Sequence, residues 1–278
     1  MKYFWNYFLP AIFLFLFFPE QSIYSIDELN EASPEYIEAS YKKAIAEFDM
    51  RNYEDSLNQI RHVIKADMNN YNLRYLAAHN HWKSGNFDSA ALHFQAAISV
   101  RPEAYGTYID FALMRIHERK YKSAEFIAQN GIKYMSQHNI PVPPKIYNIL
   151  SRIKLQQGLS SDALVYAEMA KAALNTNTGI KDNLESVVLE SRAQLSLNNF
   201  EKAELAMQWA ISLKENSPYL QNLMGYIYKK WSASFADEEL KKKYVDQANK
   251  YFQLALENTL AVDEFKVVVQ KNMDSLQQ

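Results

Sequence analysis

Residues Tyr71–Ala104 read YNLRYLAAHNHWKSGNFDSAALHFQAAISVRPEA, and the spacing of apolar residues in this stretch predicts two helices. The first half carries Leu73, Leu76, Ala77 and Ala78 and ends at the turn-forming sequence Ser84-Gly85-Asn86. In the second half the apolar residues Phe87, Ala90, Phe94 and Ala97 are separated by 3, 4 and 3 positions. That spacing places them on one face of an amphipathic α-helix, which ends before Pro102.

The same helix-turn-helix pattern recurs along the chain. A small residue near the start of each second helix marks the unit: Ser56, Ala90, Ala124, Ala163, Ala203 and Ala248. The first two gaps are 34 residues each, and the later gaps are 39, 40 and 45. First helices carry their own small residue, at Ala44, Ala78, Ala112, Ser151, Ser191 and Gly225. Small residues at both places indicate that the two helices of a pair approach closely.

An alanine, an aromatic residue four positions later and a closing proline, repeated at 34 residues, resemble the tetratricopeptide repeat. The resemblance covers residues 35–258 and is weakest in repeat four, where Ser160 and Ala167 replace the aromatic residues. It implies an all-α fold: a right-handed superhelical solenoid of about six helix-turn-helix repeats. We expect residues 259–278 to form a C-terminal capping helix, with Phe265, Val268, Val269, Met273 and Leu276 on one face.

The prolines and the polar segments support this division. After the first 25 residues, prolines occur only at positions 34, 102, 141, 143, 144 and 218, each at or just before a predicted first helix. Three insertions explain the longer gaps: an extended connector at His138–Pro144, a polar loop at Asn175–Gly179, and extra residues near Ser232–Lys243 that lengthen a helix of repeat six.

Residues 1–25 differ from the rest of the chain. Lys2 precedes an apolar run from Phe8 to Phe18, which is too short to span a bilayer but is typical of a secretory signal peptide. The alternative is an uncleaved inner-membrane anchor formed by residues 3–18, and in either case residues 26–34 form a linker. We therefore expect an exported protein, periplasmic or secreted, that contacts the membrane only through this segment.

Composition excludes several functions. A net charge of −2 leaves no positive excess for nucleic acid, and the absence of cysteine excludes disulfides and thiolate metal sites. His79 and His81 point to nearly opposite sides of one helix and cannot share a metal. Phosphate-binding glycine loops and nucleophile motifs are absent from the sequence. We expect a protein that is not an enzyme and that has no metal or cofactor.

In tetratricopeptide domains the first helices line a concave groove that receives a partner protein. By resemblance, the groove residues here are Tyr41, Tyr75, His79, Trp82, Ile109, Asn148, Arg152, Arg192, Asn222 and Tyr226. Aromatic and arginine side chains are common in binding hot spots, and this set suits an apolar segment that carries acidic groups. The alternative is that the aromatic residues pack between helices and that the arginines form surface ion pairs.

One subtype of the family clamps a C-terminal carboxylate with lysine, asparagine and arginine from three first helices. The matching positions here hold Tyr41, Ile45, Leu76, Gly106 and Asp110, so the resemblance does not extend to that subtype. Three hypotheses remain: an envelope adaptor that binds a protein partner, a structural subunit that forms homo- or hetero-oligomers through convex faces and ends, and a ligand-binding component of a transport system.

Overall fold

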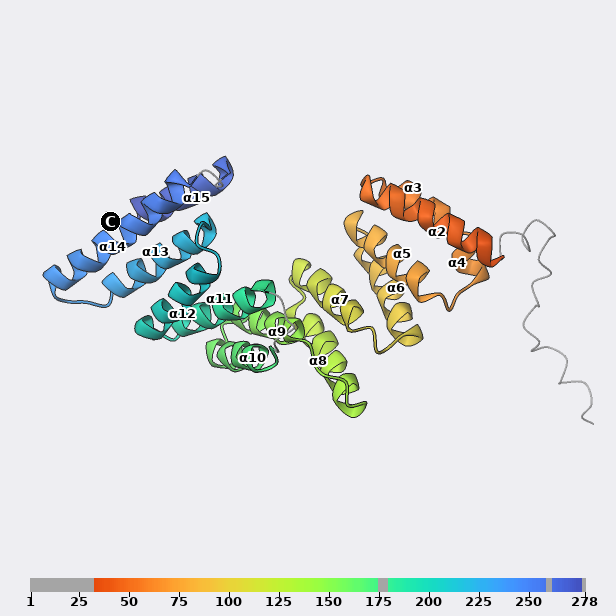
Figure 1. The fold of residues 1–278 in the computed structure, drawn as a ribbon, viewed down its shortest axis with the longest axis horizontal. Coiled ribbons are helices and arrows are strands. Elements are labelled where there is room, and N and C mark those ends of the chain that lie inside the picture. Colours follow the sequence, from red (N-terminus) through yellow and green to blue (C-terminus); the bar gives the residue numbers. More distant parts are fainter. Residues whose placement is uncertain (1–32, 175–179, 259–261, 277–278) are drawn as a thin grey trace, which may run out of the picture.

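The computed structural model describes residues 33–174, 180–258 and 262–276, which are helical apart from short connections and contain no strand. The helices follow one another as antiparallel pairs (Figure 1). They are α2 (Pro34–Asp49), α3 (Tyr53–Ile60), α4 (Val63–Ala66), α5 (Tyr71–Lys83), α6 (Phe87–Val100), α7 (Tyr105–His117), α8 (Tyr121–Gln137), α9 (Pro144–Gln156), α10 (Ser160–Ala172), α11 (Ile180–Ser196), α12 (Phe200–Leu213), α13 (Pro218–Ser232), α14 (Glu238–Glu257) and α15 (Asp263–Asp274).

The pairs stack into an open arch (Figure 1). The ends of the arch are formed by α2–α4 on one side and by α13–α15 on the other. The first helices α7, α9 and α11 lie on the inner side of the curve, whereas the second helices α8 and α10 lie on the outer side. The predicted all-α repeat solenoid is therefore confirmed, with the second helix of repeat one divided into α3 and α4.

The marker residues of the repeats meet where the two helices of a pair touch. In three repeats a serine donates a hydrogen bond to the backbone carbonyl of the small residue opposite: Ser56 to Ala44, Ser151 to Ala163 and Ser191 to Ala203, at 2.7–2.8 Å. In repeat six, a Cβ added at Gly225 would lie 2.6 Å from two ring carbons of Phe252. Only glycine leaves room for this ring, so the small residues are a packing requirement.

Five of the six intra-repeat turns reverse the chain through one residue with positive φ. These residues are Arg51, Gly85, Arg119, Gly158 and Asn198, with φ between 59° and 80°. A left-handed residue just after a helix ends it and satisfies its last carbonyl groups, which explains why the turns are short. Prolines begin α2, α9 and α13, where the missing N–H has no helical acceptor, as the sequence predicted.

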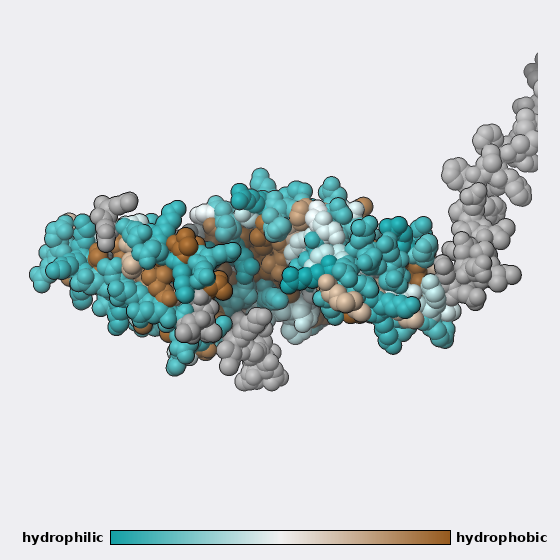
Figure 2. Space-filling view, turned by 90° about the horizontal axis from the view of Figure 1, so that it is seen from above, coloured by the Kyte–Doolittle hydropathy of each residue, from teal (hydrophilic) through white to brown (hydrophobic). Residues whose placement is uncertain are grey.

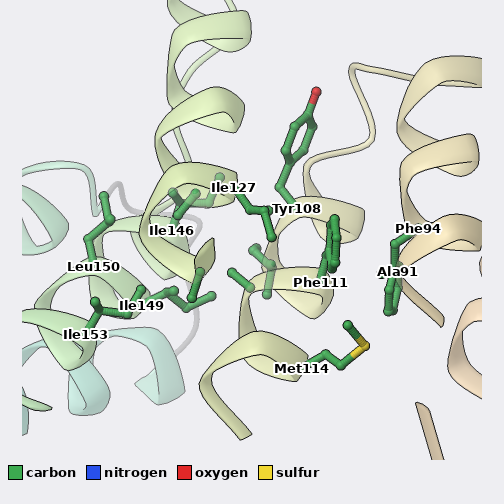
Figure 3. Close-up of a cluster of buried hydrophobic side chains, with 14 of the residues drawn as sticks. Ala91, Phe94, Tyr108, Phe111, Met114, Ile127, Ile146, Ile149, Leu150 and Ile153 are labelled. Carbon is green, nitrogen blue, oxygen red and sulfur yellow. The ribbon is translucent and has the colours of Figure 1, made fainter. Parts of the chain in front are cut away.

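The hydrophobic core runs through the stack as three clusters, one around α2–α5, one around α5–α10 and one around α11–α15. Figure 3 shows the middle cluster, in which Phe111 of α7 lies beside Phe94 of α6, and Ile127 of α8 lies between Tyr108 of α7 and the three isoleucines and one leucine of α9. Repeat four belongs to this core although it lacks the aromatic residues of the other repeats. Ala163 and Ala167 are fully buried there, because α9 and α10 pack closely through small side chains.

Helix α15 covers the last repeat, with Val269 buried and Phe265, Met273 and Leu276 packed on the core of α11–α14. The prediction is wrong for one residue of this apolar face, Val268. It is 52% exposed, because it lies about 100° around the helix from Val269. In repeat six, α14 is long, with 20 residues, and its N-cap Asp237 accepts a hydrogen bond from the Leu240 N–H at 2.8 Å.

Three predictions fall on residues that the structure does not describe. Residues 1–25, with the alternative anchor at 3–18, lie outside the described residues, as does almost all of the linker 26–34. The predicted loop Asn175–Gly179 also lies outside them. Within the described ranges, none of the helices combines the length and the apolar character that crossing a membrane requires.

Candidate binding groove

All ten residues predicted to line a groove lie on first helices, and three of these helices, α7, α9 and α11, form the inner side of the arch in Figure 1. Viewed from above, hydrophobic residues gather towards the middle of this surface, and hydrophilic residues border them (Figure 2). The ten residues fall into three groups: some pack against a neighbouring repeat, some are buried, and some are available to a partner. Their role in binding stays a prediction.

Tyr75 and His79 of α5 both point to Asp110 of α7. The Tyr75 hydroxyl donates a short hydrogen bond to the carboxylate, and the His79 Nε2 lies 3.2 Å from the same oxygen, Oδ2. One turn earlier on α5, the Tyr71 hydroxyl lies 2.9 Å from Thr107 Oγ1. Two turns of α5 are thus joined to α7 by polar side chains, which fixes repeat two against repeat three.

The electrostatics of this network favour an ionised Asp110. Burial alone would raise the pKa of the Asp110 carboxyl, but the hydrogen bonds from His79 and Tyr75 outweigh it and hold the pKa below its usual range. Burial, followed by the hydrogen bond and the charge of Asp110, raises the pKa of Tyr75 far above its ordinary value. The tyrosine remains a neutral donor, and the network links repeat two to repeat three.

The other aromatic residues of the N-terminal half pack around Phe94 of α6, which is fully buried. Trp82 and His79 both meet this ring edge-on, with ring centroids 6.3 Å and 5.4 Å away. Tyr41 is half-buried against the first core cluster, and burial raises its pKa. The main contacts of Trp82 and Tyr41 are therefore packing contacts, as in the alternative that the sequence analysis gave for the aromatic residues.

Three predicted groove residues are not exposed, so the expectation of their exposure is wrong. Ile109, Asn148 and Asn222 are 8% exposed or less. Ile109 belongs to the middle core cluster. The other two accept hydrogen bonds from neighbouring helices: Asn148 Oδ1 from Ser186 of α11 at 3.0 Å, and Asn222 Oδ1 from Asn272 of α15 at 3.1 Å. Neighbouring helices cover these three side chains, and the pattern of a single repeat does not show this.

The C-terminal half of the inner surface contains a hollow of about 670 Å³, which we call the basic hollow. It lies where α9, α11 and the start of α13 meet, and it includes two predicted residues, Arg152 and Arg192. Its lining consists of Arg152, Gln156, Leu184, Glu185, Val188, Leu189, Arg192, Lys214, Ser217, Tyr219 and Leu220.

The charges of the basic hollow are unbalanced. Arg152 forms an ion pair with Glu185, the single acidic residue of the lining. Within the described part of the chain, the side chains of Arg192 and Lys214 have no hydrogen bond or ion pair. Arg192 is half-buried, whereas Lys214 is exposed. The remaining predicted residue, Tyr226 of α13, is half-buried beneath Lys230, whose Nζ lies 5.7 Å from the ring centroid.

The basic hollow has the features of a binding site. Three cationic side chains and one carboxylate surround apolar residues, an arrangement that can hold a ligand by charge and by apolar contact. No group of three or more metal-ligating side chains occurs in the described ranges. Sequence reasoning missed Lys214 and Tyr219, which lie at the connection between repeats five and six. Pro218, next to Tyr219, marks this connection between the two repeats in the sequence.

Comparisons with known proteins agree with this architecture. No protein-family model matches the sequence. No curated protein matches it. Among solved structures, the APC/C hetero-tetramer Cut9–Hcn1 is similar with a TM-score of 0.65 at 13% identity, over 91% of this chain and 45% of that one. The present chain thus spans less than half of the length of that relative.

Two smaller structures are similar over most of their own length. PilW, a widely conserved type IV pilus biogenesis factor, has a TM-score of 0.61 at 14% identity, over 85% of this chain and 100% of that one. YrrB, a tetratricopeptide-repeat protein with an unusual peptide-binding site, has a TM-score of 0.51 at 13% identity, over 69% and 93%. The chain therefore has the tetratricopeptide-repeat fold, as the spacing of its repeats predicted.

Proposed function

We propose that this protein is a non-enzymatic interaction scaffold that holds a segment of a partner protein on the inner surface of its arch. The observation that carries the proposal is the basic hollow, an open site on first helices with an apolar lining and unpaired basic side chains. Sites of this kind bind through shape and charge. The similarity to YrrB, which has a peptide-binding site, adds support from the fold.

Site-specific photo-crosslinking in the native cells tests this proposal. A photoreactive amino acid is placed at Tyr219, on the rim of the basic hollow, or at Lys122, an exposed residue of α8. We expect a discrete adduct with one protein from position 219 and none from position 122, identified by mass spectrometry. Equal labelling from both positions, or no adduct from position 219, would contradict the proposal.

The scaffold is proposed to work outside the cytoplasm, in the envelope of a bacterial cell. The support is the character of residues 1–25, with Lys2 followed by the apolar run Phe8–Phe18. The similar fold of PilW, a pilus biogenesis factor, is consistent with an envelope machine as the partner. Fractionation with N-terminal sequencing tests this location: a periplasmic product that begins near Ile26 supports cleavage, and a cytoplasmic product with an intact N-terminus contradicts export.

A second candidate function, a subunit that assembles through its outer face, is favoured by one specific observation. Four second helices expose an apolar residue two positions after the repeat marker, and these residues are 53–68% exposed: Leu92, Phe126, Val165 and Leu205. Apolar residues repeated on one face are a common feature of interfaces. Sedimentation analysis discriminates: concentration-dependent oligomers that Leu205→Lys and Phe126→Lys disrupt support the subunit, and a monomer at high concentration opposes it.

A further inference from the structure

The base of the basic hollow is apolar. Leu189 of α11 and Leu220 of α13 are nearly fully buried and form part of its lining, and Leu184 and Val188 extend that lining along α11. Tyr219 stands at the hollow with 46% of its surface exposed, so its ring is available to a bound group. The apolar area open to a ligand belongs mainly to Leu184 and Tyr219, and it favours an apolar side chain over a fully polar ligand, because this area is removed from water on binding.

The charged side chains around this base determine which sign of charge a ligand can carry. The lining holds Arg152, Arg192 and Lys214 against the single carboxylate of Glu185, and Glu185 is engaged by Arg152. This excess of positive charge is local, since the whole chain has a net charge of −2. A carboxylate placed here meets complementary charge that the protein does not neutralise itself.

Arg192 is the residue best placed to hold the carboxylate. Arg192 is half-buried and, in the part of the chain that the structure describes, its guanidinium lacks any acceptor. An unpaired guanidinium gains strongly from a carboxylate, because the planar group can donate two parallel hydrogen bonds to it. Lys214, which is exposed at the same hollow, adds a mobile second charge without a fixed geometry.

We infer that the basic hollow binds a partner segment in which a carboxylate stands next to an apolar side chain, with Arg192 and Lys214 holding the carboxylate and the leucine-lined base receiving the apolar group. This inference rests on the proposed scaffold function and specifies the chemistry of the partner. A basic segment is excluded as the occupant, because the lining itself is basic.

Selection of random displayed peptides on the full-length protein tests the inference. We expect the selected peptides to share an aspartate, a glutamate or a free C-terminal carboxylate beside an apolar residue. Labelled synthetic versions of them are then titrated by fluorescence anisotropy. Changing the acidic residue to its amide, or adding a C-terminal amide, is expected to weaken binding by roughly tenfold, which also separates a side-chain carboxylate from a terminal one.

Charge reversal on the protein provides the matched comparison. Arg192→Glu with Lys214→Glu is expected to weaken binding of the acidic peptide by at least about tenfold, and Lys214→Glu alone by less. The control carries the same change of charge on exposed residues of α8, Lys122→Glu with Lys133→Glu, and keeps the wild-type affinity. Circular dichroism and thermal melting verify that each variant is folded. The exposed Lys214 variant keeps the test valid if the double variant unfolds.

Each other outcome overturns the inference. Peptides without acidic residues whose binding is lost on Tyr226→Ala, but not on charge reversal, leave the scaffold function standing and refute the basic hollow as an acidic site. Failure to enrich any peptide refutes the inference and counts against the scaffold function as well. A third outcome is that no peptide is enriched but citrate raises the melting temperature of the wild type and not of the double variant. The hollow would then be a site for small anions.

Discussion

The two halves of the arch use their inner surfaces differently. In repeats two and three the polar and aromatic side chains of α5 are occupied by the neighbouring repeat, because Asp110 accepts from Tyr75 and lies within hydrogen-bonding distance of His79. In repeats four to six, Arg152 meets Glu185, but Arg192 has no partner among the described residues. A side chain on a first helix is thus available for binding only when the next first helix offers nothing complementary to it.

The largest effect is expected from removing Phe94, on which the aromatic residues of the N-terminal half pack. Phe94→Ala deletes a fully buried ring and should lower the free energy of unfolding by about 3–5 kcal/mol. Urea denaturation followed by circular dichroism measures the loss. Phe126→Ala on the outer face, where the ring is 64% exposed, is the control and should change stability by less than about 1 kcal/mol. A small effect of Phe94→Ala would deny the aromatic residues their packing role.

The connection between repeats two and three is tested at Asp110. Asp110→Ala leaves the Tyr75 hydroxyl and His79 without their acceptor, and we expect a loss of about 2–3 kcal/mol in the free energy of unfolding. Asp110→Asn keeps an acceptor and should recover part of it. Glu168→Ala, on the exposed face of α10, is the matched control. In a double-mutant cycle, Tyr75→Phe should couple to Asp110→Ala; independent effects would contradict the network.

These contacts separate the features that the sequence predicts from those that it does not. The helices, their pairing and the packing of the markers follow from local spacing, because a helix pair is closed within about 34 residues. The choice between binding and packing depends on the residue that the next repeat presents. The sequence shows Asp110 as an acidic residue at a position that is basic in the carboxylate-clamping subtype. Its distance from Tyr75, however, depends on the angle between the repeats. The same angle buries Asn148 and Asn222 and brings Lys214 and Tyr219 into the hollow.

The N-terminal half should also be more sensitive to mild acid. The rings of His81 and His93 stack with centroids 5.4 Å apart and line a small cavity with Arg61, and both Nδ1 atoms are buried without a partner in the described structure. Burial, with the charges of His81 and Arg74, lowers the pKa of His93 to about 4. No acidic side chain lines this cavity to compensate a proton.

The sign of the pH effect follows from this lowered pKa. Between pH 6.5 and about 4 the unfolded chain binds a proton at His93 that the folded chain does not, so stability falls as the pH falls through that window. We expect a loss of about 1–2 kcal/mol between pH 7 and pH 5, and a smaller loss in His93→Gln. Asp110, whose pKa is lowered, adds its own loss only at still lower pH. Equal pH dependence of wild type and His93→Gln would contradict the assignment.

The smallest effect on stability is expected in the basic hollow itself. Arg152 and Glu185 form their ion pair with side chains 40% and 29% exposed, and pairs of this exposure contribute at most about 1 kcal/mol. Arg152→Ala should therefore lower the free energy of unfolding by less than about 1 kcal/mol, with a smaller difference from wild type at high salt. Arg192→Ala removes no intramolecular partner and should cost less still, within about 0.5 kcal/mol.

Thermal melting of the two variants at low and high salt measures this difference and sharpens the comparison between the halves of the arch. If Arg192→Ala destabilised the protein as much as Asp110→Ala, Arg192 would be a packing residue like Tyr75, and the contrast between an occupied and an available inner surface would be lost. If it left the melting temperature unchanged, Arg192 would be shown to contribute nothing to folding. A half-buried arginine that does not stabilise its own chain has its charge free for a partner.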